Sequence, residues 1–306
     1  METIAVAPLP CPVTGLRGNV IRKRSSEELW SAYSSYLGKE LPMFLKEKYF
    51  RNDISELYSE ESGLRWYSPC DLGGADFYEA LASQYKWYYQ VDSWDKQTAM
   101  GLLSKLQIKS MFEIGCGNGL FLKKMKEMGI DAKGTDFNVS AIDSARLEDL
   151  DVHVPDSLPS RIADVDCMCA FQTIEHIHDP VAFLRHYIDI CSPRYILMSA
   201  PTHESLLGKS SDPLAWPPHH ATQWSQRAFA CLAGKVGYKV SAVYRDRLSY
   251  KSFVKTAARE TNGPKTISPV WPGERLGRLA FQVYKTVGFS WARHHHSILV
   301  LLEQDT

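Results

Sequence analysis

Two acidic residues and a glycine-rich turn are the part of this sequence whose residue types and spacing best suit ligand binding. An apolar run ends in the turn Gly115–Gly119, where every second residue is glycine, and Glu113 stands just before it. A helical pattern follows, and a second short run ends at Asp136. Glycine permits positive φ and close approach of a ligand to the backbone, while a carboxylate after the second strand can accept hydrogen bonds from ribose hydroxyls. The stretch predicts a strand–turn–helix–strand nucleotide site, and the acid beside the turn favours a cationic, phosphate-free ligand over a pyrophosphate.

Four further residues of a reactive type fall in two short stretches. Glu175 and His176 follow the apolar run 165–171, which predicts a strand buried on both faces. Ligands of such sheets bind beyond the carboxyl ends of the strands, so we expect both side chains to face a cleft. His219 and His220 follow two prolines that stiffen the loop. A neutral imidazole is a competent base for a hydroxyl near pH 7. We therefore predict that His219 or His220 is the catalytic base, and His176 or Glu175 is the next candidate. Helix capping and hydrogen bonds to the loop backbone are the alternative.

We predict no metal site. A divalent ion held by Glu175 together with His176 or His178 is the open alternative. The consecutive histidines His294–His296 cannot converge on one ion, because successive side chains of a strand alternate between its faces.

The elements that must position these residues alternate between helix and strand from about residue 91 onward. Such alternation is typical of an α/β fold with a largely parallel sheet. The expected helices are 94–106, 138–150, 181–191, 225–236 and 274–287, and the expected strands beyond the glycine-turn unit are 151–154, 165–171, 194–200, 238–247 and 297–302.

The segment Glu113-Ile-Gly-Cys-Gly-Asn-Gly119, together with Asp136, resembles the cofactor site of class I S-adenosylmethionine-dependent methyltransferases. It is most similar to the branch that methylates small molecules and sugars in biosynthetic clusters, and the resemblance covers about residues 86–306. It implies a Rossmann-like, seven-stranded, mostly parallel sheet with an antiparallel last strand. It also implies S-adenosyl-L-methionine as the cofactor. The cofactor-binding residues expected on this basis are Glu113, Gly115, Cys116, Gly117, Asp136, Phe137, Asp156, Ser157 and Gln172.

The resemblance also places an aromatic segment, residues 76–89, over the cofactor cleft as a lid. Tyr78, Tyr85 and Tyr88 would then line the substrate pocket, and an aromatic face suits a sulfonium. Trp216 and Trp224 flank the histidine loop and could stack on a sugar ring or a flat substrate. Ordinary packing of these aromatic residues is the alternative.

Two domains are expected, an N-terminal segment at 1–90 with helical residues 25–50, and a methyltransferase domain at 91–306. Some relatives that this chain resembles begin with a zinc knuckle. Here Cys11 is the one cysteine left of the four ligand positions, and the second half would fall at Ser59–Leu64. Serine and threonine are poor zinc ligands, so we predict a knuckle without metal or a simple turn-rich tail. A basic helical insertion is expected at about 248–293, as a solvated face or as a site for a phosphorylated, nucleotide-linked or lipid-linked substrate.

Composition excludes several classes of function. The 306 residues carry 35 Lys and Arg against 35 Asp and Glu, so no overall positive field would attract nucleic acid. Seven cysteines, mostly within apolar runs, are typical of reduced core residues in a cytoplasmic protein. No stretch approaches the ~20 apolar residues of a membrane span. We expect a small-molecule or glycan-type acceptor and no nucleic-acid partner, and a homodimer is left open.

The expected reaction is in-line transfer of a methyl group to a hydroxyl of a sugar or another small polar intermediate, with a histidine base. N-methylation of an amine or amino sugar is the first alternative, because a neutral amine needs no strong base. A non-catalytic binding protein that kept the nucleotide fold is the second. A dinucleotide oxidoreductase is disfavoured because the third glycine falls at the wrong spacing.

Overall fold

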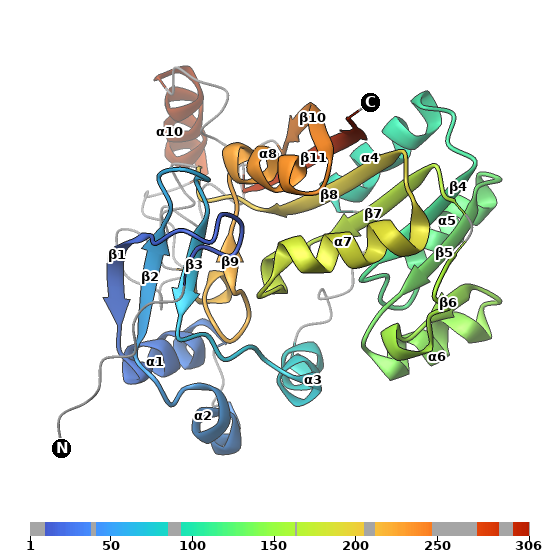
Figure 1. Cartoon of the computed structure of the whole chain (residues 1–306). Helices are drawn as coiled ribbons and strands as arrows, with labels where there is room; N and C mark the ends of the chain where they lie inside the picture. The colour runs from blue at the N-terminus through green and yellow to red at the C-terminus, as the bar shows by residue number, and fades with distance from the viewer. Residues whose placement is uncertain are drawn as a thin grey trace.

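The structure is a computed structural model that describes residues 10–37, 41–84, 93–162, 164–204, 212–246, 274–287 and 296–305. Two β-sheets organise these residues, one of seven strands and one of four (Figure 1). The seven-stranded sheet is formed after residue 93, and the four-stranded sheet is formed largely before residue 70. The strands of the two sheets thus come mostly from different parts of the sequence.

The seven-stranded sheet has the order β10-β11-β8-β7-β4-β5-β6. Strands β8, β7, β4, β5 and β6 run parallel, while β11 is antiparallel to both of its neighbours, β8 and β10. The predicted Rossmann-like sheet with an antiparallel last strand is confirmed. The strands are β4 (Ser110–Ile114), β5 (Asp131–Thr135), β6 (Asp151–His153), β7 (Cys167–Phe171), β8 (Tyr195–Pro201), β10 (Tyr238–Arg245) and β11 (Ser297–Gln304).

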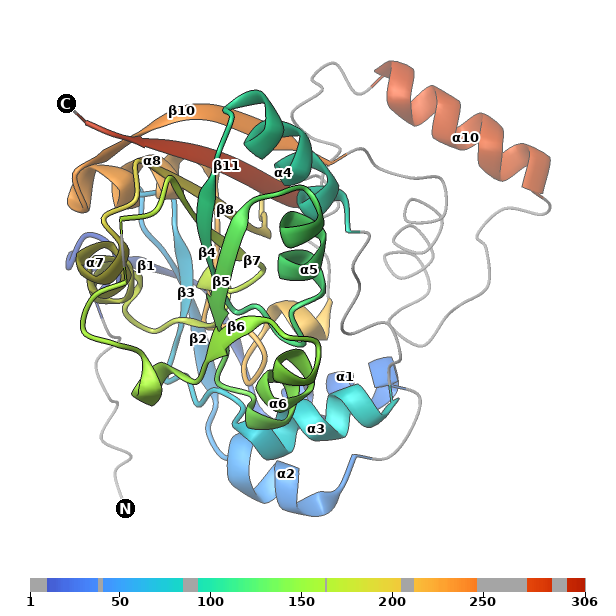
Figure 2. The ribbon, with the colours of Figure 1, turned by 90° about the vertical axis from the view of Figure 1, so that its right-hand side faces the viewer.

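Helices cover both faces of this sheet (Figure 2). One face packs against α4 (Trp94–Lys105), α5 (Leu120–Glu127) and α6 (Val139–Leu147), and the other against α7 (Pro180–Cys191) and α8 (Gln226–Lys235). Every residue of the central strand β7 is buried, because apolar side chains on both of its faces meet a helical layer. A shift of β7 along its neighbours would disturb this packing, so the burial fixes which residues stand at the carboxyl end of the strand.

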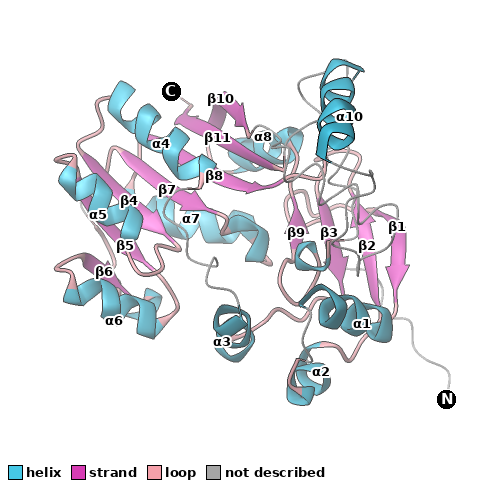
Figure 3. Ribbon diagram, turned by 180° about the vertical axis from the view of Figure 1, so that it is seen from behind, coloured by secondary structure: helices cyan, strands magenta, loops and turns pink. Residues whose placement is uncertain are grey.

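The four-stranded sheet has the order β1-β2-β3-β9 and is antiparallel (Figure 3). Its members are β1 (Asn19–Arg24), β2 (Ile54–Tyr58), β3 (Arg65–Ser68) and β9 (Thr222–Gln223), and α1 (Ser26–Leu37), α2 (Met43–Tyr49) and α3 (Ala75–Gln84) lie beside it. Sequence reasoning predicted helix in this unit but no sheet, because β1 is polar and almost wholly exposed. The last strand, β9, comes from the histidine loop of the larger unit, so the two units share an element.

The two halves of the expected knuckle do meet. Cys11 Sγ lies 3.4 Å from Ser62 Oγ, and both residues are buried. His203, at the end of β8, reaches the same region and lies 2.9 Å from the Gly63 carbonyl through Nε2. Burial, with a smaller contribution from Arg65, lowers the pKa of His203 to about 4. This buried imidazole therefore connects the sheets as a neutral group.

Part of the basic segment at 248–293 is described, as α10 (Glu274–Val287), and its other residues lie outside the described ranges. Leu276, Leu279 and Val283 of this helix are exposed, while Phe281 is buried. None of the described helices is long and apolar enough to cross a membrane.

Candidate active site

The glycine turn and the acid that follows β5 form one hydrogen-bonded unit. The Asp136 carboxylate accepts the Gly117 N–H at 2.8 Å through Oδ2 and the Asn138 N–H at 2.8 Å through Oδ1. Burial raises the pKa of Asp136, and these two amide donors oppose that shift. Each carboxylate oxygen keeps a second acceptor direction, so the group can still take hydrogen bonds from a diol.

Position 115 can be occupied without strain only by glycine. Its φ is +76°, and a Cβ at this position would lie 2.5 Å from Thr173 Oγ1. Two effects therefore select glycine here, namely the left-handed backbone and the close approach of the segment after β7. Cys116 is buried beneath the turn, so its contribution on the ligand side is its backbone.

Glu113 is fully buried, and neither of its carboxylate oxygens has a hydrogen-bond partner among the described residues. Lys96 of α4 faces it, with Nζ 3.5 Å from Oε1. Burial raises the pKa of Glu113, and the Lys96 ammonium opposes that shift. Sequence reasoning missed Lys96, because a lysine in the first turn of a helix gives no signal of a buried partner 17 residues away.

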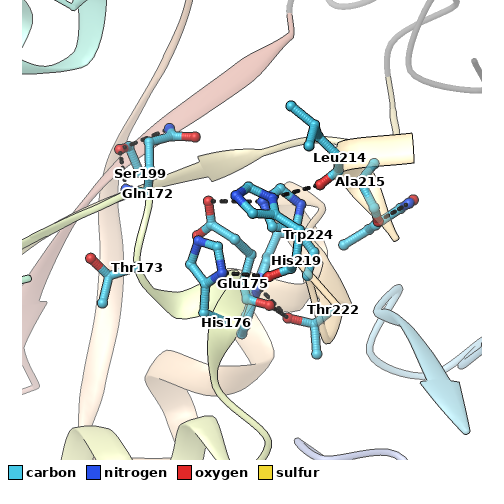
Figure 4. A network of polar contacts seen from close by, with 12 residues as sticks. Gln172, Thr173, Glu175, His176, Ser199, Leu214, Ala215, His219, Thr222 and Trp224 are labelled. Atoms are coloured by element: carbon cyan, nitrogen blue, oxygen red, sulfur yellow. Dashed lines mark hydrogen bonds and ion pairs between the residues drawn. The ribbon is translucent and has the colours of Figure 1, made fainter. Parts of the chain in front are cut away.

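Gln172 ends β7 with a φ of +50° and turns its amide toward α4. Its Nε2 donates to the Ser199 hydroxyl oxygen at 3.2 Å (Figure 4) and to Asp95 Oδ2 at 3.3 Å, and the Ser199 hydroxyl donates to the same Asp95 oxygen at 2.5 Å. Asp95 is a second polar residue of α4 that sequence reasoning missed. The three side chains hold the ends of β7 and β8 together beside the glycine turn.

Three expected cofactor residues lie at the exposed edge of the site. Phe137, next to Asp136, is 61% exposed, which leaves its ring available for stacking. Asp156 and Ser157 are exposed in the 3-10 turn Pro155–Ser157 that follows β6. All three follow the carboxyl ends of β5 and β6, where parallel sheets bind ligands.

The histidines from two separate stretches form one cluster (Figure 4). The ring centroids of His176 and His219 are 4.9 Å apart, those of His176 and His220 are 4.8 Å apart, and those of His219 and His220 are 4.4 Å apart. His176 Nδ1 lies 2.6 Å from the His219 carbonyl oxygen, and His219 Nδ1 lies 2.8 Å from the Leu214 carbonyl oxygen. In both rings Nδ1 must therefore carry the proton, because a carbonyl oxygen only accepts.

Glu175 lies beside this cluster and is 1% exposed. Its Oε1 is 4.0 Å from His220 Nε2, and within the described residues neither carboxylate oxygen makes a hydrogen bond. Burial raises the pKa of Glu175 to about 8. Burial also lowers the pKa of His176 to about 4 and, with help from His176, that of His219 to about 3. The imidazoles are therefore neutral near pH 7.

Tyr78 of α3 joins the cluster to the nucleotide half of the site. Its Oη lies 3.0 Å from His176 Nδ1 and 3.4 Å from the His219 carbonyl oxygen. The Tyr78 ring also lies 5.8 Å from the ring of Phe137. The Tyr78 side chain thus links Phe137, the residue after Asp136, to the imidazoles. Tyr85 and Tyr88, the other tyrosines expected here, lie outside the described residues.

The two tryptophans of the histidine loop are core residues in this structure. Trp216 is 3% exposed and packs under the Arg24 guanidinium, 3.7 Å from the ring centroid. Trp224 is fully buried, 4.7 Å from the ring of Phe229. Neither ring is therefore available as a stacking surface beside the cluster. Burial of rings of this size contributes a large hydrophobic stabilisation, which is the physical reason for their place in the core.

The loop that carries His219 and His220 is held from the N-terminal unit. The Tyr33 hydroxyl donates to the Trp216 carbonyl at 2.7 Å and accepts the His219 N–H at 3.3 Å. At the other end of the loop, the Ala221 N–H donates to the Glu175 carbonyl at 2.8 Å. The position of both imidazoles therefore depends on a residue of α1, a segment for which the sequence predicted only a helix.

Comparison with known proteins identifies a family and several more distant relatives. A model of the methyltransferase domain family matches residues 77–243. A ubiquinone biosynthesis O-methyltransferase of Proteus mirabilis (strain HI4320) is 24% identical over 94 residues, which are 28% of this chain and 38% of that protein. The enzyme of the same name from Bordetella avium (strain 197N) is 23% identical over 139 residues, 40% of this chain and 58% of that protein. The chain thus spans less than two thirds of either relative.

A solved structure shows the same fold. It is a chain of the complex between the Haloferax volcanii Trm112 methyltransferase activator and a methyltransferase, with a TM-score of 0.52 and 17% identity. The match covers 76% of this chain and 97% of that one. At this level of identity the likeness concerns the fold.

Proposed function

The chain belongs to the methyltransferase domain family, and we propose that it transfers the methyl group of S-adenosylmethionine to a hydroxyl of a small polar molecule. The cofactor supplies a methyl group already activated on a sulfonium, so the protein mainly provides proximity and alignment. The family assigns methyl transfer, whereas the acceptor atom and the roles of individual residues are our proposal.

The glycine-turn side of the site fits this cofactor. Asp136 is fixed by two backbone amides and can accept hydrogen bonds from the ribose diol. The buried Glu113 carboxylate faces Lys96 at 3.5 Å and makes no hydrogen bond within the described residues, so it retains acceptor capacity for the cationic amino group of the methionine end, directly or through water. Gly115 and Gly117 allow the ligand to approach the backbone, and the exposed ring of Phe137 is available to stack on adenine.

The observation that carries the proposal of oxygen as acceptor is the contact of Tyr78 with both halves of the site. It brings three neutral imidazoles and a buried carboxyl next to the cofactor side, which is the arrangement needed to remove a hydroxyl proton. In the reaction the acceptor oxygen bonds to the methyl carbon while the carbon–sulfur bond breaks. The electron pair stays on sulfur, and the hydroxyl proton passes to an imidazole of the cluster. The two curated relatives are O-methyltransferases by name, which supports an oxygen acceptor.

The test is transfer from isotopically methyl-labelled S-adenosylmethionine to three acceptor panels: glycosides with free hydroxyls, phenols and catechols, and primary or secondary amines. We expect label in a hydroxyl-bearing panel. Label found in amines alone would replace the proposal with N-methylation. Binding of cofactor without transfer to any panel would favour a non-catalytic role.

Variants of the cluster test the base. His219→Ala and His220→Ala should leave the affinity for S-adenosylhomocysteine within about twofold, because neither residue belongs to the glycine-turn side. At least one of them should lower turnover by about 10²–10⁴-fold. The matched control is His186→Ala, an exposed histidine of α7. Full turnover in both cluster variants would place the base elsewhere.

A further inference from the structure

The histidine cluster has the dimensions of a metal site. One ring nitrogen from each of His176, His219 and His220 lies within 4.8 Å of the other two. A tetrahedral ion with metal–nitrogen bonds of about 2.0–2.1 Å needs ligand nitrogens about 3.4 Å apart. Rotation of rings that already contact one another would close the remaining difference.

The hydrogen bonds around the cluster are those that orient metal-binding histidines. His176 and His219 each point Nδ1–H at a backbone carbonyl, of His219 and Leu214 respectively. This fixes the tautomer in which the lone pair of the ring is on Nε2. Histidines that ligate metals commonly donate their other N–H in this way to a carbonyl or carboxylate.

Glu175 supplies the independent observation. Its carboxyl is 1% exposed and, within the described part of the chain, neither oxygen makes a hydrogen bond. The facing group is His220 Nε2, 4.0 Å away, and His220 Nδ1 is also buried without a hydrogen-bond partner there. A buried polar group without a partner is costly. A cation between Glu175 and the three rings would compensate for it.

We propose that His176, His219 and His220, with Glu175 as the fourth ligand, bind one divalent transition-metal ion of the zinc class. Three imidazoles and one carboxylate suit zinc and its neighbours. Magnesium and calcium prefer all-oxygen sites, so they do not fit this donor set. The cluster contacts Tyr78, whose ring also lies 5.8 Å from that of Phe137, and we assign the cluster to the acceptor side of the proposed reaction.

Binding of the ion does not depend on the proposed function, but its chemical consequence rests on that function. An ion at this place would lower the pKa of an acceptor hydroxyl that joins its coordination shell. The hydroxyl proton would then pass to solvent water, because the imidazoles that could take it in the metal-free protein are bound to the ion. Activity and metal binding can be measured separately, so failure of one is distinguishable from failure of the other.

The experiment is calorimetric titration of zinc chloride into the full chain after treatment with a chelator. We expect one ion per chain in the wild type. We expect at least 100-fold weaker binding in His219→Ala and in the near-isosteric Glu175→Gln, and unchanged binding in His186→Ala. Titration with cobalt(II) should give the visible bands of a tetrahedral site in the wild type but not in either cluster variant. Magnesium chloride should give no comparable binding.

Adventitious binding to thiols would be the same in the wild type and in the cluster variants, and that result would overturn the inference. Absence of binding in the wild type would overturn it as well. Affinity for S-adenosylhomocysteine shows whether each variant is folded, because the glycine-turn side does not include the substituted residues. Failure of the zinc-loaded protein to methylate any acceptor would count against the proposed function and leave the metal site intact.

Discussion

Replacement of Lys96 by methionine would test the buried ion pair that faces the glycine turn. Lys96 Nζ lies 3.5 Å from Glu113 Oε1, and these side chains are 18% and 0% exposed. At an effective dielectric constant of about 20, two unit charges at this distance attract each other by about 5 kcal/mol. Removal of one partner of a buried pair typically costs about 3–5 kcal/mol, because the other charge is left uncompensated. We therefore expect Lys96→Met to lower the free energy of unfolding by about 3 kcal/mol at pH 8.

The loss should depend on pH in a defined direction. Burial raises the pKa of Glu113 above its usual value, and removal of the ammonium raises it further. A carboxyl whose pKa is raised in the folded state destabilises that state increasingly as pH rises above its unfolded pKa. The cost of Lys96→Met should therefore be larger at pH 8 than at pH 5, where a protonated Glu113 no longer needs a partner.

Urea unfolding of the wild type, Lys96→Met, Glu113→Gln, the double variant and Lys105→Met at both pH values would measure this. Lys105→Met is the matched control, since Lys105 is an exposed residue of the same helix. The double variant Lys96→Met/Glu113→Gln should recover most of the loss, because it removes the unpaired charge. The reasoning would be refuted if Lys96→Met cost no more than Lys105→Met at pH 8, or if the double-mutant cycle gave a coupling near zero.

Three further predictions concern single residues. Asp136→Ala should weaken binding of S-adenosylhomocysteine by about 10²-fold or more in calorimetry, since it removes two charge-assisted hydrogen bonds to the ribose; unchanged affinity would contradict the assignment. Gly115→Ala should destabilise the protein by at least about 1 kcal/mol more than Gly129→Ala in urea unfolding. Both glycines have positive φ, but a Cβ at Gly129 would have nothing within 4 Å, whereas one at Gly115 would lie against Thr173. Equal destabilisation by the two substitutions would contradict this reasoning. The pKa of His203 is lowered from 6.5 to about 4 in the folded protein, so as pH falls the unfolded chain binds a proton first. The free energy of unfolding therefore decreases as pH falls from 6.5 to 4, by at most about 3 kcal/mol for this group. His203→Gln should therefore lose less stability than the wild type between pH 7.5 and pH 5, and an identical loss would exclude His203 as a source.

The large sheet could be predicted from sequence because its signals are local. The glycine turn, the apolar run at β7 and the acid Asp136 can each be identified from a few consecutive residues. The partners of these residues could not be predicted in the same way. Lys96 and Asp95 come from a helix whose sequence shows no sign of a buried acid or amide opposite it.

The histidine cluster was predicted in part. Glu175 and His176 were expected at the end of a strand, and His219 and His220 were expected in a stiff loop near the same cleft. Their direct contact depends on how the loop is held, and the Tyr33 hydroxyl that holds it is 186 residues away in sequence from His219. The tryptophans were expected at a surface because of their neighbours, but the volume of the rings placed them in the core.

Strand β9 has a consequence for how this protein could be divided or recombined. Its two residues are separated from His220 by one residue and pair with β3, so the acceptor-side loop is completed by a sheet whose other strands come from the first third of the chain. A fragment beginning at Trp94 would retain the glycine turn and lose the scaffold of the loop. A chimera that exchanges the first 84 residues with those of a relative would change the acceptor preference and leave the affinity for the methyl donor in place.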